Sequence, residues 1–507
     1  MLGQVRSCVV TGLEGSLVDV EAIVTGGLPK VLIVGMTDVA IQEARERVRG
    51  AIKNSGFRFP GTRVSVNLAP ADVHKEGPAF DLPIAVAILA ASNQVHGDLR
   101  DTLLVGELSM DGSLRHTQSI LPMVAVAVER GVRKVIVPAV DAAEAALIEG
   151  VTVYPAERLG DVVDHVHGLK PLSAVPPRPL SDIRCVPSSA LIDFAHIKGQ
   201  DHGKRALELA ASGGHNILMV GPPGSGKTLM ARALPGILPA LTPQEALEVT
   251  KLYSIAGLLP PDMPLVTQRP FRAPHYTISN AALVGGGKIP RPGEITLSHR
   301  GVLFLDELPE FGQATLEVLR QPLEDKVVTI SRVNGTVTYP TNLIMVGAMN
   351  PCPCGFHGDP VRECTCSPVS VSRYQRRISG PLLDRIDLFV QVPRVEYEKL
   401  VSDAPAESSE AIRQRVEAAR ARQRTRFAGT ACLTNADMSP VEARQHCTLD
   451  EAGQRLIQAA MERFNLSARA FHRVLKLCRT IADVAGEEGI SAAHVAEALQ
   501  YRARGLG

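Results

Sequence analysis

The chain has 507 residues, a formal net charge of +1, a hydrophobic content of 45% and no tryptophan. A chain of this length is expected to fold into about two to four domains. The near-neutral charge excludes a globally basic surface, so any contact with nucleic acid must be local. The first ten residues lack the apolar region of a signal peptide, and no apolar stretch reaches the length of about 20 residues that a membrane helix needs. We therefore expect a cytoplasmic protein with no membrane partner, whose cysteines stay reduced unless they bind metal.

Residues 1–167 alternate strand-like and helix-like segments, which predicts an α/β or α+β domain. The strand-like segments are 63–68 and 134–138, and the helix-like segments are 80–91 and 123–130. Five prolines and the lack of apolar periodicity in residues 168–188 predict a linker.

A second domain is expected over residues 189–395. Short apolar segments predict its buried strands, at 216–220, 302–306 and 343–348. From residue 396 to 507 the pattern becomes helical. The sequence therefore predicts an α/β fold with a parallel sheet in the central domain, followed by a helical C-terminal part.

The most specific motif lies between the apolar segment 216–220 and a helix-like segment at 229–234. It fits the phosphate-loop pattern G-x-x-x-x-G-K-[ST] in the strand–loop–helix context that the motif requires, although a chance glycine-rich turn is the alternative. Backbone N–H groups and the helix start are expected to bind phosphate, with the lysine at the terminal phosphates and the threonine at Mg²⁺. The predicted nucleotide-binding residues are Gly221, Pro222, Pro223, Gly224, Ser225, Gly226, Lys227 and Thr228.

An acidic pair follows the apolar segment 302–305. An acid at the carboxyl end of a parallel strand faces the ligand crevice of an α/β sheet. We expect Asp306 to hold Mg²⁺, directly or through water, and Glu307 to polarise the attacking water, so that the site is a hydrolase. Without the phosphate loop upstream, the same pattern would indicate only a buried strand and a turn.

Two further residues resemble elements of the ring-forming AAA+ ATPases. Asn350 ends an apolar strand at the place of sensor 1, which orients the attacking water, although a strand-end asparagine is also a common turn former. Arg385 lies in a segment that resembles the arginine-finger region, where it would stabilise the transferring phosphoryl group of a neighbouring subunit. The alternative for Arg385 is a surface ion pair with Asp384 or Asp387.

A third resemblance concerns the C-terminal part. Arg469 begins a helix there and resembles sensor 2, which contacts the nucleotide of its own subunit. Arg473 and Arg479 lie on nearby turns of the same predicted helix and are competing candidates.

Three segments carry a family resemblance. Residues 271–277 (Phe-Arg-Ala-Pro-His-Tyr-Thr), 285–287 and 292–294, leading into the acidic strand, resemble the magnesium-chelatase-like branch of the AAA+ ATPases. Over its whole length the chain is similar to the YifB/ComM family, and residues 197–200 (Ile-Lys-Gly-Gln) form the short motif that precedes such cores. The resemblance implies a Lon-like N-terminal α/β domain, an AAA+ P-loop core and a helical lid. It also implies a homo-hexameric helicase that uses ATP and Mg²⁺ to drive branch migration of DNA in natural transformation.

A protease and a chelatase are the alternatives within this resemblance. Residues 75–81 occupy the place where Lon carries its nucleophilic serine, and Ala79 stands at that position. Residues 112–123, where Lon's lysine would fall, contain no lysine. A serine–lysine dyad needs both groups, so we expect a non-proteolytic scaffold. A chelatase motor would need a large partner subunit, and we expect such motors to lack this N-terminal domain.

Two segments are candidates for contact with single-stranded or branched DNA. Residues 326–340 predict a hairpin, because Asn334 and Gly335 form a strong turn signal between β-rich flanks, and related helicases carry a pore hairpin here. The second segment is the glycine-rich loop near residues 285–291. Both can also be solvated loops. The candidate DNA-contacting residues are Lys288, Arg291, Lys326 and Arg332.

Four cysteines form the pattern C-x-C, nine residues, C-x-C. Four thiolates on a short loop can close a tetrahedral zinc site, which would be structural because no coordination position stays open. His357 is a possible substitute ligand, and unligated cysteines are the alternative because the spacing differs from the usual C-x₂-C. The predicted zinc ligands are Cys352, Cys354, Cys364 and Cys366.

The sequence favours a hexameric AAA+ ATPase that acts as a DNA helicase or translocase. A chaperone-like or chelatase-like remodeller of a protein partner is the alternative, and DNA-stimulated ATP hydrolysis would distinguish the two. A protein that only binds partners is disfavoured, because the nucleotide motifs include all the residues that hydrolysis needs.

Overall fold

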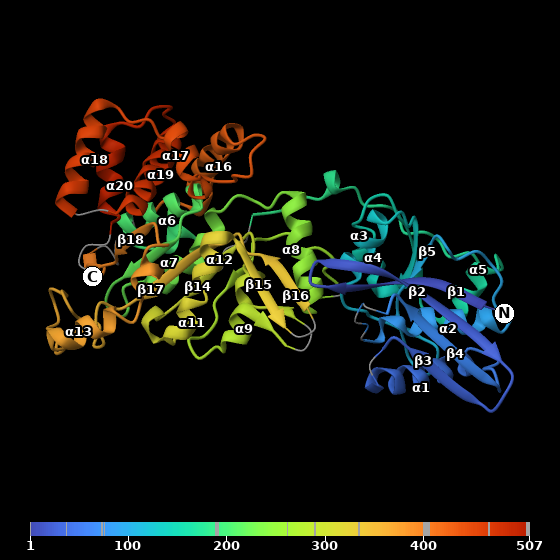
Figure 1. Ribbon diagram of the computed structural model, residues 1–507. Coiled ribbons are helices and arrows are strands. Elements are labelled where there is room, and N and C mark those ends of the chain that lie inside the picture. Colours follow the sequence, from blue (N-terminus) through green and yellow to red (C-terminus); the bar gives the residue numbers. More distant parts are fainter. Residues whose placement is uncertain are drawn as a thin grey trace.

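The computed structural model describes residues 2–36, 38–71, 73, 75, 77–187, 192–260, 262–287, 290–332, 335–398, 406–464 and 467–502. The chain forms three parts, with the N-terminal domain at the right of Figure 1, the phosphate-loop domain in the middle and the helical C-terminal part at the upper left. In this described part of the chain, no helix is both long and apolar enough to cross a membrane.

The N-terminal domain is built on a seven-stranded mixed sheet with the order β3-β4-β2-β1-β5-β8-β9. Its strands are β1 Leu2–Thr11, β2 Glu14–Thr25, β3 Lys30–Val34, β4 Arg63–Ala69, β5 Thr102–Leu104, β8 Lys134–Pro138 and β9 Thr152–Ala156. A separate ribbon pairs β6 Glu107–Leu108 with β7 Leu114–Arg115. The helices are α1 Asp38–Asn54, α2 Asp81–Ala91, α3 Ile120–Glu129, α4 Ala142–Ala145 and α5 Leu159–Val166.

Helix α2 forms the core of this domain and packs against β1 and β2. Its residues are apolar on almost every side and nearly all are buried, which is typical of a helix enclosed by other elements. The exception is Asp81, a buried carboxylate whose Oδ2 lies 2.6 Å from Nε of Arg47 on α1. Burial raises the pKa of Asp81 to about 6, and the arginine opposes this shift. The four elements predicted from the sequence in this domain are confirmed as β4, α2, α3 and β8.

Residues 168–187 connect the first two domains. They contain one short 3₁₀ helix, Leu180–Asp182, and an isolated bridge that pairs Val175 with Val153 of β9.

The central domain has a five-stranded sheet with the order β11-β14-β17-β10-β18, and all neighbouring strands are parallel. These strands are β10 Ile217–Val220, β11 Phe271–Arg272, β14 Val302–Leu305, β17 Ile344–Met349 and β18 Leu388–Gln391. β10, β14 and β17 are buried along their whole length, which explains why their sequences are continuously apolar and do not alternate. The predicted parallel α/β core is confirmed.

Helices and two small ribbons surround this sheet. The helices are α6 Asp201–Gly213, α7 Lys227–Ala233, α8 Pro243–Ala256, α9 Asn280–Val284, α10 Glu294–Leu297, α11 Gln313–Glu317, α12 Arg320–Asp325, α13 Pro368–Gln375 and α14 Gly380–Leu383. One ribbon pairs β12 Gly285–Gly286 with β13 Arg291–Pro292, and the other pairs β15 Val327–Arg332 with β16 Gly335–Pro340. The second ribbon is the hairpin that the sequence predicted.

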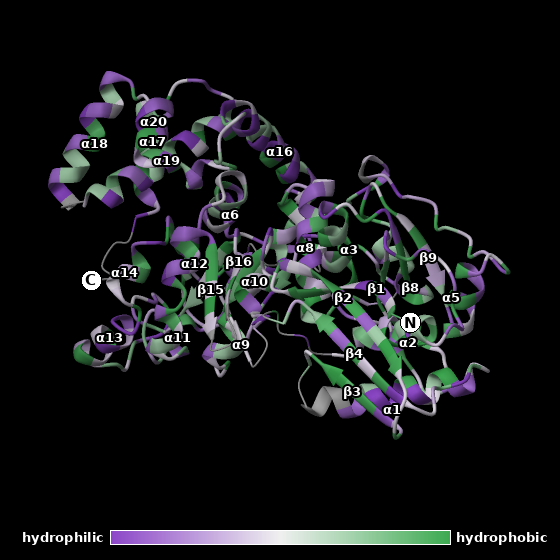
Figure 2. Ribbon diagram, turned by 45° about the vertical axis from the view of Figure 1, so that its right-hand side comes forward, coloured by the Kyte–Doolittle hydropathy of each residue, from purple (hydrophilic) through white to green (hydrophobic). Residues whose placement is uncertain are grey.

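The C-terminal part is helical, as predicted. Its helices are α16 Ser409–Arg426, α17 Pro440–His446, α18 Glu451–Phe464, α19 Ala468–Ala485 and α20 Ala492–Gln500. Hydrophilic and hydrophobic residues alternate around α18 in Figure 2, as expected for helices that bury one face against one another.

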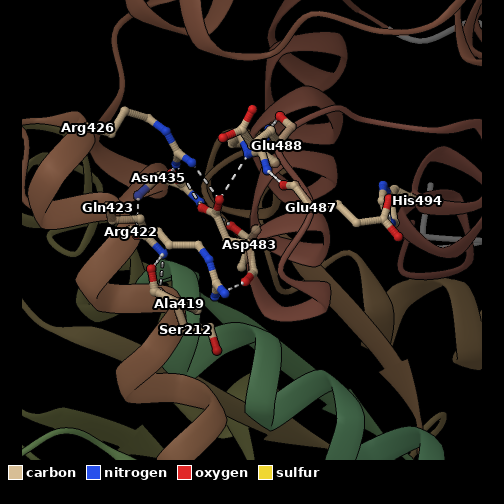
Figure 3. Close-up of polar contacts among 12 residues, drawn as sticks. Ser212, Ala419, Arg422, Gln423, Arg426, Asn435, Asp483, Glu487, Glu488 and His494 are labelled. Atoms are coloured by element: carbon tan, nitrogen blue, oxygen red, sulfur yellow. Dashed lines mark hydrogen bonds and ion pairs between the residues drawn. The ribbon is translucent and has the colours of Figure 1, made fainter.

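A buried polar network holds this part together (Figure 3). The carboxylate of Asp483 on α19 accepts hydrogen bonds from Arg426 on α16, at 2.5 and 2.8 Å, and from Asn435 at 2.8 Å. Gln423 of α16 donates to the carbonyl oxygen of Ser212 in α6, at 2.9 Å. The network therefore joins helices of the C-terminal part to one another and attaches them to the central domain.

The N-terminal domain contacts the central domain at α8 and at the hairpin β15–β16. Ser254 of α8 donates to Oε1 of Glu144 at 2.6 Å, where α3 packs against α8. The turn between β1 and β2 meets the hairpin, since a Cβ atom added at Gly12 would lie 2.2 Å from Cγ1 of Val337.

Candidate nucleotide and metal site

The phosphate loop lies at the carboxyl end of β10, in the interior of the sheet. Val220 at the end of β10 is in register with Met349 of β17 and Gln391 of β18, so three strand ends meet at the place where α/β sheets bind ligands. Gly224 and Gly226 have φ values of 78° and 92°, a left-handed conformation that glycine adopts without a steric penalty. These two residues let the loop curl before α7 begins.

A cavity of about 390 Å³ beside this loop joins three of the predicted motifs. It is lined by Pro223, Gly224, Ser225, Gly226, Lys227, Thr228, Leu229, Asp306, Glu307, Met349 and Asn350. Gly221 and Pro222 lie at the beginning of the loop and line a neighbouring cavity. The fold thus brings the phosphate loop, the acidic pair and the strand-end asparagine to one place.

The ammonium group of Lys227 is held inside this cavity. It donates hydrogen bonds to the carbonyl oxygens of Gly221 and Pro222, at 2.7 and 2.9 Å, and to Oδ1 of Asn350 at 3.3 Å. Burial lowers the pKa of Lys227 to about 8, and the acidic pair opposes this shift. The amine therefore stays mostly cationic at neutral pH and titrates within an accessible range.

A hydroxyl group and a carboxylate lie side by side at the cavity. Oγ1 of Thr228 donates to Oδ2 of Asp306 at 2.8 Å, and the backbone N–H of Glu307 donates to Oδ1 of the same aspartate at 3.0 Å. Oxygen atoms of this kind are the ligands that Mg²⁺ prefers. Glu307 has a φ of 51°, which is uncommon for a residue other than glycine and concentrates at functional sites.

Arg385 and Arg469 lie together in a different cavity. This cavity has a volume of about 720 Å³ and lies between the central domain and the helical part. Its charged lining consists of Arg385, Arg469, Arg473, Lys326 and Lys476 with Glu324, Asp384, Asp387, Asp437 and Glu442. Neither Arg385 nor Arg469 lines the cavity beside the phosphate loop of its own chain.

The guanidinium group of Arg385 forms an ion pair with Glu324 of α12. The two carboxylates considered from the sequence have other partners. Asp384 accepts a hydrogen bond from Arg473 at 3.0 Å, and Asp387 accepts one from the backbone N–H at the start of β10, at 3.1 Å. Burial and neighbouring cations lower the pKa of Arg385.

The three arginines of α19 have different surroundings. Arg479 donates to Asp483 in the buried network at 3.1 Å, and Arg473 is held by Asp384. The side chain of Arg469 is exposed in the first turn of α19 and, within the described part of the chain, makes no hydrogen bond or ion pair. Arg469 is therefore the candidate of the three that is available to a ligand.

The four predicted zinc ligands form one cluster. The sulfur atoms of Cys352, Cys354, Cys364 and Cys366 all lie within 4.8 Å of one another, and none of these cysteines is in a disulfide. Three of the separations are 3.3, 3.6 and 3.7 Å, close to the separation of about 3.8 Å that a tetrahedral site with zinc–sulfur bonds of about 2.3 Å requires. The donor set and its spacing therefore fit Zn²⁺.

Backbone N–H groups support these thiols. The N–H of His357 donates to Sγ of Cys352 at 3.3 Å, and its imidazole is not part of the cluster. The N–H of Phe356 lowers the pKa of the Cys354 thiol to about 5. This contact favours the thiolate form of Cys354, which is the form that binds metal, whereas burial and hydrogen bonds to neighbouring thiols raise the pKa values of Cys364 and Cys366.

Comparisons with known proteins identify the family. Residues 193–400 match the family described as magnesium chelatase, subunit ChlI; residues 20–141 match subunit ChlI of Mg-chelatase; and residues 406–502 match the C-terminal part of magnesium chelatase subunit ChlI. The chain is 41% identical to the competence protein ComM of Haemophilus influenzae over 503 residues, which are 97% of this chain and 96% of that protein. The chain belongs to the YifB/ComM family of magnesium-chelatase-like proteins.

Other relatives agree with this family. The uncharacterized protein YifB of Escherichia coli is also 41% identical, over 505 residues that cover 99% of this chain and 97% of that protein. The magnesium-chelatase 67 kDa subunit of Chlorobaculum tepidum is 28% identical over 167 residues, which are 32% of this chain and 24% of that protein. The family resemblance seen in the sequence is confirmed, and the central domain is that of a magnesium-chelatase-like AAA ATPase, which uses ATP and Mg²⁺.

The comparison of the N-terminal domain removes one reason for disfavouring a chelatase-like role. That domain was expected to be missing from chelatase motors, but residues 20–141 match a family named for the chelatase subunit ChlI. The presence of the domain therefore does not argue against a chelatase-like partner. Ala79 lies in a buried 3₁₀ turn, Pro78–Phe80, and the absence of protease activity remains a prediction.

The candidate DNA-contacting residues have different environments. Lys326 lies 3.6 Å from Oδ1 of Asp437 and lines the cavity that contains Arg385. Arg291 is exposed at the start of β13. The backbone of Arg332 ends β15, and Lys288 lies outside the described residues.

The two candidate DNA-contacting segments are packed against each other. The hydroxyl of Tyr339 on β16 donates to the carbonyl oxygen of Pro290, at 2.7 Å. A Cβ atom added at Gly285 of β12 would lie 2.7 Å from Cδ1 of Ile330 on β15. The ribbons β12–β13 and β15–β16 therefore form one surface element.

Two acidic residues near the candidate site were not found from the sequence. Glu324 pairs with Arg385 across 61 positions, and Asp437 lies beside Lys326. No local pattern marks either residue, because each meets its partner only in the folded chain. Glu324 does so through packing within the central domain, and Asp437 through packing of the helical part against that domain.

Proposed function

We propose that this chain is a homo-hexameric motor that couples ATP hydrolysis to movement on DNA, promoting branch migration of recombination intermediates. The observation that supports hydrolysis is the convergence of Lys227, Thr228, Asp306, Glu307 and Asn350 on one cavity. DNA as the partner is supported by the 41% identity to a protein named for competence and by the joint packing of the two basic loops.

The nucleotide site would work as follows. The N–H groups of the phosphate loop and Lys227 would bind the phosphates, and Thr228 and Asp306 would hold Mg²⁺, which would supply positive charge to neutralise the phosphates. Glu307 accepts a proton from the attacking water, and Asn350 orients this water. Because Lys227 already bonds to Asn350, movement of the lysine toward phosphate would release the asparagine amide for water.

Arg385 and Arg469 are proposed to act on the nucleotide of a neighbouring subunit. Both line a cavity that is separate from the phosphate loop of their own chain. A guanidinium group supplied by a neighbour stabilises charge on the transferring phosphoryl group. This proposal differs from the role in the same subunit that the sequence suggested for Arg469.

The four cysteines are proposed to hold a structural Zn²⁺. Four thiolates fill a tetrahedral coordination sphere, so the metal offers no open position for catalysis. Removal of zinc is therefore expected to affect the protein by changing the position of the four-cysteine loop and not by removing a catalytic group.

DNA is proposed to contact the surface element formed by the ribbons β12–β13 and β15–β16. Arg291, Arg332 and Lys288 are the basic residues proposed to contact phosphates there. Such contacts carry no sequence information, so binding should tolerate any sequence and weaken with salt. Lys326 is a weaker candidate because of its contact with Asp437.

The test is ATP hydrolysis by the purified chain with no DNA, with single-stranded DNA and with a four-way junction, at several salt concentrations. We expect stimulation by DNA that declines with salt, and Glu307→Gln should bind ATP without hydrolysing it. Hydrolysis that no DNA stimulates, even at low salt, would contradict the DNA part of the proposal. Hydrolysis by Glu307→Gln at the parental rate would contradict the catalytic role of Glu307.

A second candidate is a chelatase-like remodeller of a protein partner. It is favoured by one observation, the match of all three parts of the chain to families named for magnesium chelatase subunit ChlI. ATP hydrolysis that DNA leaves unchanged but a co-purifying protein stimulates would favour this candidate.

A further inference from the structure

A third cavity, of about 910 Å³, begins where the phosphate-loop cavity ends. Gly221 and Pro222 line the third cavity, whereas the following loop residues line the phosphate-loop cavity. Its other walls are residues 200–202, Pro351, residues 391–397 from the end of β18 onward, and part of the loop between Cys354 and Cys364. Apart from Gly221 and Pro222 of the phosphate loop and Gln200 of the short motif before the core, its lining lies outside the nucleotide motifs.

The position of this cavity points to the nucleoside half of ATP as its ligand. A diphosphate or triphosphate held by the loop and the start of α7 would leave the ribose and the base outside the phosphate-loop cavity, and the third cavity adjoins that cavity at Gly221 and Pro222. Ligand cavities of about 300 to 1,000 Å³ are the usual size for molecules of this class. Gln200 fixes one wall, because its Nε2 donates to Ser225 of the phosphate loop at 3.1 Å and to the carbonyl oxygen of Pro393 at 2.6 Å.

The four-cysteine loop touches the phosphate loop directly. Gly355 has a φ of 87°, and a Cβ atom added there would lie 2.6 Å from Cδ of Pro223. The next residues of the loop turn toward the third cavity, where His357, Gly358 and Asp359 line it. The cysteine cluster and the third cavity therefore lie on two sides of the same short segment.

A second contact fixes the far side of this segment. Nε of Arg394 lies 2.8 Å from Oδ2 of Asp359, whose side chain is almost fully buried. The guanidinium groups of Arg394 and Arg362 also lie 5.4 and 4.2 Å from the ring centre of Phe356, a distance at which cations and aromatic rings attract each other.

The segment 355–363 contains no helix or strand of its own. Ordering such a loop costs conformational entropy, which the contacts that hold the loop in place must offset. Zinc bound by four sulfur ligands at the two ends of the loop would hold the loop strongly in place, because metal binding and folding of a small site are coupled.

We propose that the zinc-bound four-cysteine loop is one wall of the site for the base and ribose of ATP, so that zinc sets both nucleotide affinity and base preference. This inference rests on the nucleotide site proposed above and on zinc at the cysteines. Loss of zinc would loosen the wall while the phosphate loop, which is held by β10 and α7, keeps its contacts with the phosphates.

The test compares the binding of ADP and UDP, which share the diphosphate and differ in the base. The parent chain and the Cys354→Ser/Cys364→Ser variant are compared by calorimetry with Mg²⁺ present, and zinc is measured by elemental analysis. We expect about one zinc per parent chain, tighter binding of ADP than of UDP, and a loss of about tenfold or more in ADP affinity in the variant with little change for UDP. Cys432→Ser, outside the cluster, is the matched control and should change neither affinity nor zinc content.

A second variant distinguishes loss of the cavity wall from misfolding of the chain. Arg394→Ala breaks the contact with Asp359 but keeps all four cysteines, so it should retain zinc and still lose ADP affinity relative to UDP. Parental ADP affinity in a zinc-free, folded cysteine variant would overturn the inference, as would equal affinity of the parent for ADP and UDP. A parent that binds no nucleotide would instead contradict the proposed nucleotide site, and a parent without zinc would contradict the metal assignment.

Discussion

At the scale of single residues, the environment of Lys227 sets a measurable property of the nucleotide site. Burial lowers the pKa of this amine from 10.5 to about 8. Below pH 8 the amine is charged and attracts phosphate, and above pH 8 the charge is progressively lost. The same shift makes the unfolded chain bind more protons than the folded chain between about pH 8 and pH 10.5, so this group's contribution to stability rises across that window.

We therefore predict that ATP affinity falls as pH rises above about 8. The loss of ATP affinity caused by Lys227 should be at most about tenfold per pH unit, because one proton is taken up when ATP binds. The measurement is the dissociation constant of ATP between pH 7 and pH 9.5. In Lys227→Arg the cation does not titrate in this range, and the steep pH dependence should disappear. A parental affinity that stays constant to pH 9.5 would contradict a functional charge on Lys227.

Arg385 leads to a prediction about cooperation between subunits. Arg385→Ala should bind ATP nearly as well as the parent but lose most hydrolysis, because the guanidinium group would act on a neighbour's nucleotide. Mixing Arg385→Ala with Lys227→Ala should restore part of the activity, since some interfaces then combine an intact phosphate loop with an intact arginine. No recovery in confirmed mixed rings, at any mixing ratio, would contradict action between subunits.

The residues of the candidate site were predictable where a local pattern carries the chemistry. Lys227, Thr228 and Asp306 follow from a motif and a strand-end rule, and the structure brings them to one cavity. Glu324, the ion-pair partner of Arg385, was not predictable because this pair forms only through tertiary packing. Sequence reasoning considered Asp384 and Asp387 instead, since it sees only neighbours along the chain.

At the scale of elements, apolar segments of the sequence predicted three of the five strands of the central sheet. β10, β14 and β17 are buried on both faces, so their sequences are continuous apolar runs with clear ends. β11 and β18 were not predicted, because β11 has only two residues and the apolar part of β18 is limited to three residues between Asp387 and Gln391. The hairpin β15–β16 was predictable from its turn residues, but its contact with the turn between β1 and β2 was not.

The buried network of the helical part leads to a stability prediction. Asp483→Ala should remove the partner of Arg426 and Arg479 and leave their charges uncompensated, which typically costs about 3 to 5 kcal/mol. The measurement is the denaturant midpoint of helix unfolding by circular dichroism. Glu462→Gln, on the exposed side of α18, is the matched control and should leave the midpoint unchanged. An Asp483→Ala midpoint equal to that of the parent would contradict a stabilising role for the network.

At the scale of the whole molecule, direct contacts join the three parts. The helical part contributes Arg469 to a cavity shared with Arg385 of the central domain. The N-terminal domain touches the hairpin at Gly12 and the helix α8 through Glu144. The surface element formed by β12–β13 and β15–β16 therefore contacts the N-terminal domain and lines no part of the phosphate-loop cavity.

This arrangement predicts that DNA contact and basal hydrolysis can be separated. Arg291→Ala combined with Arg332→Ala should lower DNA-stimulated hydrolysis and weaken DNA binding, while hydrolysis without DNA stays near the parental rate. The expected reason is that neither residue belongs to the nucleotide motifs. DNA stimulation equal to that of the parent in this double variant would show that DNA is bound elsewhere.

The central claim is that ATP hydrolysis moves DNA. The most direct measurement follows a fluorescently labelled four-way DNA junction, mixed with the chain, ATP and Mg²⁺ at low salt, and detects separation of the labelled arms. We predict that the parent separates the arms in an ATP-dependent way, and that Glu307→Gln binds the junction but leaves it intact. A parent that hydrolyses ATP and binds the junction without ever moving its arms would contradict the claim.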